Sequence, residues 1–200
     1  MNQGFSKFIA FVFHPVFINL LNLWLLFNLF PSLSHGIPLR VQLFYISFIF
    51  ISTSIIPIIT VFVLRFTGKV NSIMLHLREE RKMPYLVTML LYFFNYYNFT
   101  KYPTHPLILS YLLACAAVVG LVMVFNFYTK ISIHLATLGA LAGLLAVASQ
   151  YSQFDLRLLL VLSILLSGFV ASARLSSNAH QPKEVYSGFV LGFVLMFFIL

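Results

Sequence analysis

Seven apolar runs recur along this chain, separated by charges, prolines or polar clusters. They cover residues 8–30, 41–64, 84–102, 107–128, 133–150, 157–173 and 184–200. Runs of about twenty apolar residues have the length of a helix that crosses a bilayer. In the hydrocarbon core only helices and closed barrels satisfy their backbone groups, and unbroken runs indicate helices. The pattern predicts an all-α, polytopic transmembrane bundle of six to seven spans, with residues 1–200 as a single domain.

Composition agrees with this fold class. Hydrophobic residues make up 61% of the chain and charged residues 8%, which excludes an ordinary soluble domain. The first run is too long for a cleaved signal peptide and is interpreted as a span. The third run is short and ends in the tyrosine-rich "FFNYYNFTKY", typical of an interface belt, so a tilted or re-entrant helix is the alternative. Residues 65–83 are basic and partly amphipathic, which predicts a segment along the membrane surface.

The formal charge of +8 does not indicate nucleic-acid binding, because the cations stand in short loops beside the spans. With seven crossings, one side of the bilayer collects nine cations, at positions 7, 65, 69, 78, 81, 82, 130, 174 and 183, and the other side three, at 40, 101 and 157. The positive-inside rule favours the cytoplasm for the nine. Five of the nine cations belong to polar clusters (78, 81, 82, 130 and 174). Without them the count is four cations on one side against three on the other, which does not decide the orientation.

Small residues bear on packing and on partners. Gly139 and Gly143, like Gly188 and Gly192, are four residues apart, which permits close helix contacts inside the bundle or in a homo-oligomer. The single cysteine, Cys115, lies in an apolar run, so neither a disulfide framework nor a cysteine-based metal site is expected.

Three polar clusters interrupt the apolar pattern: "HLREERKMPY" at 76–85, "KISIH" at 130–134 and "ARLSSNAHQPKEVYSG" at 173–188. Two predicted helices separate each cluster from the next. An even number of crossings returns the chain to the same face of the membrane, so the three clusters are expected to build one site. The histidines at 35 and 105 fall on the opposite face and are excluded from it.

The last cluster carries the most chemistry. Pro182 predicts a helix that starts near residue 181, with His180 at its edge and Glu184 about one turn inside. A carboxylate there can hold one imidazole nitrogen as a donor and free the other as a nucleophile or base. Arg174 supplies a planar fork for phosphate oxygens, and the helix start adds exposed N–H groups. These groups suit an anionic phosphoryl group.

The middle cluster offers a second histidine. Ser132 is placed to cap the fifth helix, His134 lies in its first turn and Lys130 comes just before. Two opposed histidines can act as a pair, one attacking phosphorus and one protonating the leaving oxygen. Ser132 and nearby amides could hold a phosphate oxygen.

Arg174-x5-His180-x3-Glu184 resembles the third signature of the type 2 phosphatidic acid phosphatase superfamily, Ser-Arg-x5-His-x3-Asp. "VYSGFVLG" is similar to the small-residue helix that follows it, and "ISIH" at 131–134 resembles the second signature, Pro-Ser-Gly-His, in its serine and histidine. The likeness covers mainly residues 128–195 and is closest to short, Bacteroidetes-type bacterial proteins.

The resemblance implies a six-helix phosphatase-like core in a bacterial inner membrane and a lipid or prenyl phosphate as substrate, hydrolysed or transferred without metal or cofactor. It implies that His180 is the nucleophile that forms a phosphohistidine, that Glu184 orients it, that His134 is the general acid and that Arg174 binds phosphate. The first signature, Lys-x6-Arg-Pro, is rewritten: aligning its proline with Pro84 puts His76 and Met83 at the cationic positions. Arg78, Arg81 and Lys82 are the candidate replacements for these cations.

Simpler interpretations stay open. The charged run 78–82 could be a solvated face or a lipid-headgroup anchor. Glu184 could pair with Lys183 or Lys130 at the surface. His14 before Pro15 is interpreted as a structural kink. The alternative to an enzyme is a degenerate phosphatase-like protein that binds, carries or scaffolds lipid phosphates.

Overall fold

The computed structural model describes residues 2–73, 75 and 77–200. Its elements are helical throughout, and no strand occurs in these residues. In chain order they are α1 (Gln3–Val12), α2 (Pro15–Leu29), α3 (Pro31–Ser34), α4 (Leu39–Phe50), η1 (Ile51–Ile55), α5 (Ile56–Phe66), α6 (Arg78–Phe99), α7 (Pro106–Phe125), α8 (Ile133–Tyr151), α9 (Arg157–Ser176) and α10 (Pro182–Ile199). The element η1 is a π-helical turn.

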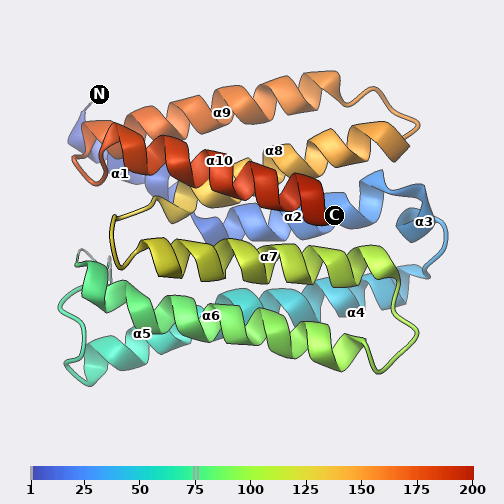
Figure 1. Ribbon diagram of the computed structural model, residues 1–200, viewed down its shortest axis with the longest axis horizontal. Helices are drawn as coiled ribbons and strands as arrows, with labels where there is room; N and C mark the ends of the chain where they lie inside the picture. The colour runs from blue at the N-terminus through green and yellow to red at the C-terminus, as the bar shows by residue number, and fades with distance from the viewer. Residues whose placement is uncertain (1, 74, 76) are drawn as a thin grey trace.

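Six helical segments of the described chain are long and apolar enough to cross a membrane. They are Gln3–Leu29, Leu39–Phe66, Pro106–Phe125, Ile133–Tyr151, Arg157–Ser176 and Pro182–Ile199. All six correspond to predicted runs, and the all-helical fold class is confirmed. The helices run side by side along one direction (Figure 1), consistent with an integral membrane protein.

The third predicted run needs correction. It belongs to α6, which begins at Arg78 and therefore includes the charged run 78–82. Glu80, Arg81 and Asn95 are buried on this helix, and it is not among the six apolar segments. Antiparallel to α7 and packed along it (Figure 1), α6 is a seventh long helix of the bundle.

The expected surface segment at 65–83 does not form a separate element. Helix α5 continues to Phe66, a connection without helix follows in the described residues, and the rest of the segment is the first turn and a half of α6. Glu79 and Glu80 lie in that first turn, where carboxylates favour a helix start. The charged run is therefore the N-terminus of a bundle helix.

Helix α8 lies at the centre of the bundle and is buried on most of its surface. It packs most closely on α10, because glycines face backbone across the contact. An added Cβ on Gly139 would collide with the Phe189 carbonyl, and one on Gly192 with the Ala136 carbonyl. Gly143 and Gly188 are also crowded, though less closely, by the Phe193 and Ser132 carbonyls. The small-residue faces therefore pack within the chain, and a homo-oligomer would need another surface.

Two of the apolar segments are broken. Helix α1 ends at Val12 and α2 starts at Pro15, with His14 as its N-cap, so the predicted kink is a full helix break. The π-helical turn η1 interrupts α4–α5. Breaks of this kind in membrane helices occur where backbone lines a cavity, and π-turns are frequent at functional sites.

Candidate functional site

The three polar clusters meet at one end of the bundle, the left end in Figure 1. Hydrogen bonds hold them close together: the Ser132 amide donates to the Glu184 carbonyl at 3.0 Å, and Arg78 Nη1 donates at 3.0 Å to the carbonyl of Tyr128, two residues before the middle cluster. Asn126 Nδ2 also donates to the Arg78 carbonyl, at 2.9 Å. The prediction that an even number of helices brings these clusters together is confirmed.

A cavity of about 370 Å³ begins at this end and extends into the bundle. The basic and imidazole side chains on its wall are Lys7, His14, Arg81, His134, Arg174 and His180. Its described lining includes no aspartate or glutamate. A cavity with this lining has a positive potential and favours an anion.

His180 is held from behind. Its Nδ1 lies 2.8 Å from the Lys130 carbonyl oxygen and 3.2 Å from Glu184 Oε2. Both oxygens accept, so Nδ1 carries the proton and Nε2 keeps a lone pair. Nε2 is buried and has no hydrogen-bond partner among the described residues. His180 lines the cavity whereas Lys130 and Glu184, the partners of its Nδ1, do not, so Nε2 is the ring nitrogen left for a ligand, as a nucleophile requires.

Charge and burial keep the His180 ring neutral. Burial, together with the positive charges of Arg174 and Arg81, lowers its pKa below the ordinary value of 6.5, and these effects outweigh the Lys130 carbonyl and Glu184, which raise it. Burial and the charge of Arg81 also lower the pKa of Lys130. A neutral His180 at pH 7 leaves the Nε2 lone pair free to attack.

Glu184 has two partners at the start of α10. Its Oε2 accepts from the Gln181 amide at 3.0 Å, as part of a capping box, and from His180 Nδ1. The carboxylate therefore fixes the helix start and the imidazole together. The alternative pairing with Lys183 or Lys130 is not observed, since neither lysine forms an ion pair with Glu184 in the described part of the chain.

Two guanidinium groups reach the cavity from different helices. Arg81 is buried on α6 and its Nε donates to the Leu75 carbonyl at 2.9 Å. Arg174, in the last turn of α9, has a buried Nε without a hydrogen-bond partner among the described residues. Neither forms an ion pair in the described part of the chain. Burying unpaired positive charge is costly, so the arrangement favours an anionic ligand.

His134 lines the same cavity from α8. Its Nε2 lies 3.1 Å from the Ala10 carbonyl and therefore donates, while Nδ1 is buried without a partner among the described residues. The nitrogen free to exchange a proton with a ligand is thus Nδ1.

His14 is a site residue that the sequence interpretation missed. Its ring stands edge-on to His134, with centroids 5.6 Å apart, and its Nδ1 accepts from the Val16 amide at 3.4 Å. The neutral ring then carries its proton on Nε2. The kink interpretation was right about the backbone. A histidine within a span, near the end that carries the other clusters, was the sequence signal that could have indicated a site residue.

The other predicted residues lie beside the cavity. Ser132 is the N-cap of α8, but its hydroxyl makes no capping bond and has no partner among the described residues. Lys130 contributes its carbonyl to His180. Arg78 bonds the Tyr128 carbonyl, and Lys82 stacks over the Phe127 ring at 4.9 Å. Of the three candidate cations on α6 only Arg81 lines the cavity, and His76 lies outside the described residues.

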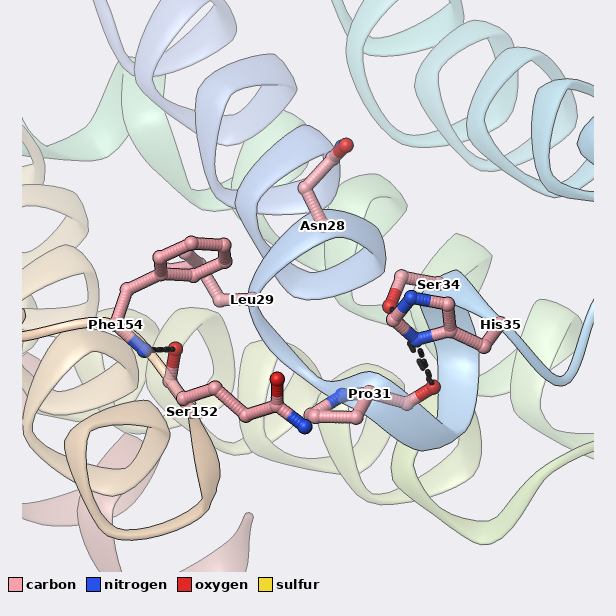
Figure 2. A pocket seen from close by; sticks show the side chains of 8 residues that line it. Asn28, Leu29, Pro31, Ser34, His35, Ser152 and Phe154 are labelled. Carbon is pink, nitrogen blue, oxygen red and sulfur yellow. Dashed lines mark hydrogen bonds between the residues drawn. The ribbon is translucent and has the colours of Figure 1, made fainter.

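A smaller pocket of about 230 Å³ lies at the other end of the bundle, between the α2–α3 corner and the α8–α9 connection (Figure 2). Several of its polar groups bond to their own neighbours. His35 Nδ1 contacts the Pro31 carbonyl at 3.3 Å, and Ser152 Oγ accepts from the Phe154 amide at 3.1 Å. His35 is thus separated from the clusters, as predicted.

Among the described residues no group of three or more His, Cys, Asp or Glu side chains is placed to hold a metal ion. No protein-family model, curated protein or solved structure matches this chain. Fold and site together define an all-helical protein whose described residues include six potential membrane spans and a cation-lined cavity at one end of the bundle.

Proposed function

We propose that this protein is a membrane-embedded, metal-independent lipid phosphate phosphatase or phosphotransferase with His180 as its nucleophile. The observation that carries the proposal is the free, buried Nε2 of His180 on the wall of a cavity that holds two arginines and no described carboxylate. An anion seated by Arg81 and Arg174 would place phosphorus in front of that nitrogen. The likeness of Arg174, His180 and Glu184 to the phosphatase signature supports the same roles.

The first step forms a bond between His180 Nε2 and phosphorus and breaks the bond to the leaving oxygen. Arg81 and Arg174 neutralise the equatorial oxygens, where charge accumulates. The Nδ1 proton stays on the ring, and the Lys130 carbonyl and Glu184 stabilise the resulting cation. The leaving oxygen takes the Nδ1 proton of a doubly protonated His134, which leaves a neutral ring whose Nε2 proton stays donated to the Ala10 carbonyl.

The second step returns the enzyme to its starting state. Water, or an alcohol in a transferase, attacks the phosphohistidine and gives its proton to His134 Nδ1. The N–P bond breaks and the electron pair returns to His180 Nε2. The preformed cradle of arginines and histidines would supply most of the rate by positioning and charge.

The cavity also has an apolar wall that suits a lipid tail. Phe11 of α1 and Ile58, Val61 and Phe62 of α5 line it, and Phe11 and Phe62 are exposed. A lipid or prenyl phosphate could enter sideways from the bilayer, with its tail against these residues and its phosphate at the helix ends. In this proposal seven crossings enclose a phosphatase-like core in a bacterial inner membrane, with the site on the cytoplasmic side.

A second candidate is a phosphatase-like protein that binds or carries lipid phosphates without turnover. One observation favours it: the Nε2 proton of His134 is already donated to Ala10, so the neutral ring has no proton for a leaving group. Arg78 and Lys82 also make contacts away from the cavity, so Arg81 is the one cation of the run 78–82 that lines it.

One experiment separates the two candidates. The protein is purified in detergent and assayed for phosphate release from phosphatidic acid, prenyl pyrophosphates and phosphatidylglycerol phosphate, beside His180→Ala and the matched control His35→Ala. We expect release by the wild type and His35→Ala and none by His180→Ala. Release that survives His180→Ala, or binding of these lipids without any release, contradicts the enzyme proposal.

A further inference from the structure

The cavity continues from its cationic end to a neutral, polar inner end. Residues that line it there are Asn19 and Asn22 of α2, Thr53 and Ser54 of η1, and Tyr92 of α6. At 1.5 Å per residue, Asn22 lies about 12 Å along the helix axis from His14. The proposed reaction uses none of these side chains, so the inner end requires its own explanation.

Asn19 organises this inner end. Its Nδ2 donates to Ser54 Oγ at 3.2 Å and Thr53 Oγ1 at 3.4 Å, and its Oδ1 accepts from the Tyr92 and Tyr111 hydroxyls at 3.0 Å each. The wide π-turn brings two successive hydroxyl residues toward the same side chain. The hydrogen-bonding capacity of the Asn19 carboxamide is therefore filled, and its position is fixed.

Asn22, almost one turn further along α2, is the opposite case. Its side chain is buried, with 3% exposed, and it lines the cavity. Its Oδ1 has no hydrogen-bond partner among the described residues. Folded proteins pair the great majority of buried amides, so an unpaired carboxamide on a cavity wall indicates a ligand group that completes it.

We propose that the inner end is a second subsite that binds a hydroxyl group on the chain of the lipid phosphate, about 12 Å from the phosphate end. This inference rests on the proposed function. A charged group is excluded, because the described walls at this depth carry no opposite charge. A carbonyl only accepts and would leave Asn22 Oδ1 unpaired, whereas a hydroxyl donates to Oδ1 and accepts from Nδ2.

Binding of two probes tests the subsite: decyl phosphate and its ω-hydroxy derivative, which differ in one hydroxyl at the far end of the chain. Dissociation constants are measured on purified protein in detergent. We expect the wild type to bind the hydroxylated probe about tenfold more tightly. Asn22→Leu keeps the branch at Cγ but replaces the amide with apolar methyl groups, so it should lose this preference and bind decyl phosphate at least as well as the wild type.

Two controls make the result decisive. Asn28→Leu changes an exposed asparagine near the other end of α2 and should keep the preference. The melting temperature of ligand-free Asn22→Leu should equal or exceed that of the wild type, since an unpaired amide is replaced by an apolar group. Equal affinity of the wild type for both probes overturns the subsite alone. Failure of both probes to bind contradicts the proposed function as well.

Discussion

Helix α9 has an arginine at each end, and their surroundings differ. Arg157, in its first turn, is exposed and forms an ion pair with Asp155 at 3.0 Å. Arg174, in its last turn, is partly buried, lines the cavity with Arg81, His134 and His180, and has no ion pair in the described chain. A charge that is already neutralised offers little to a ligand, whereas an unneutralised one attracts an anion.

The same contrast holds for the two ends of the bundle. The pocket at the end of Arg157 has polar groups that bond to adjacent residues (Figure 2). The cavity at the end of Arg174 leaves His180 Nε2, His134 Nδ1 and Arg174 Nε without partners among the described residues. Each end has a pocket and a histidine, so the unpaired polar groups are the feature that identifies the site.

Replacing the nucleophile should have the largest effect. His180→Ala removes the nitrogen that bonds to phosphorus, and we expect phosphate release to fall by about 10⁴-fold or more, as for other catalytic nucleophiles. When the wild type is denatured during turnover, an acid-labile phosphohistidine should be recovered. The variant should not form it. His35→Ala, at the opposite end, should change neither. A phosphohistidine detected in the His180→Ala protein would rule out His180 as the nucleophile.

Arg174→Gln should rank second. Removing one preformed cationic donor to a transition state lowers the rate by about 10²–10³-fold. The ligand-free protein should melt at a higher temperature, because the variant no longer buries an unpaired charge. Rates and melting curves of one preparation measure both effects. Loss of activity together with loss of stability would indicate instead that Arg174 has a structural role.

Glu184→Gln tests how His180 is held. Glutamine keeps the capping geometry but removes the charge behind the ring, and we expect kcat to fall about 10- to 100-fold. In the wild type the pKa of His180 is below 6.5, so the acid limb of kcat/KM should lie at that depressed value. Since Glu184 raises this pKa, the variant's acid limb should move to still lower pH. If the acid limb of the pH profile does not move in the variant, Glu184 does not tune the pKa of His180.

His180 also links pH to stability. Its folded-state pKa is lower than its unfolded value of 6.5, so the unfolded chain binds the extra proton first. Stability is therefore lost as the pH falls below about 6.5. His180→Ala should flatten this part of the curve of melting temperature against pH. A curve identical to that of the wild type would show that the ring is not held neutral.

His14→Ser tests the residue that was missed. Serine keeps an N-cap for α2 but removes the imidazole beside His134. If the ring takes part in proton transfer, kcat should fall about 10- to 100-fold, at the low end of general acid–base effects. An unchanged kcat with a normal melting temperature would leave His14 only its capping role.

The sequence predicted most of the fold, because apolar runs of spanning length are a strong signal. The α6 boundary was wrong because the rule required an apolar run, whereas this helix buries Glu80 and Arg81. Motif spacing predicted the Glu184–His180 contact. Side-chain direction was not predictable in the same way: Arg78, Arg81 and Lys82 lie within five residues, but only Arg81 lines the cavity.

The smallest effect is expected at the other end of α9. Arg157→Gln breaks an ion pair whose partners are both largely exposed, 87% and 62% of their side-chain surface. Exposed pairs contribute little because water and salt screen them, so neither melting temperature nor phosphate release should change measurably. Measured beside Arg174→Gln, this variant removes the same charge from the same helix. Equal losses from both substitutions would mean that net charge, and not an unpaired arginine in the cavity, governs activity.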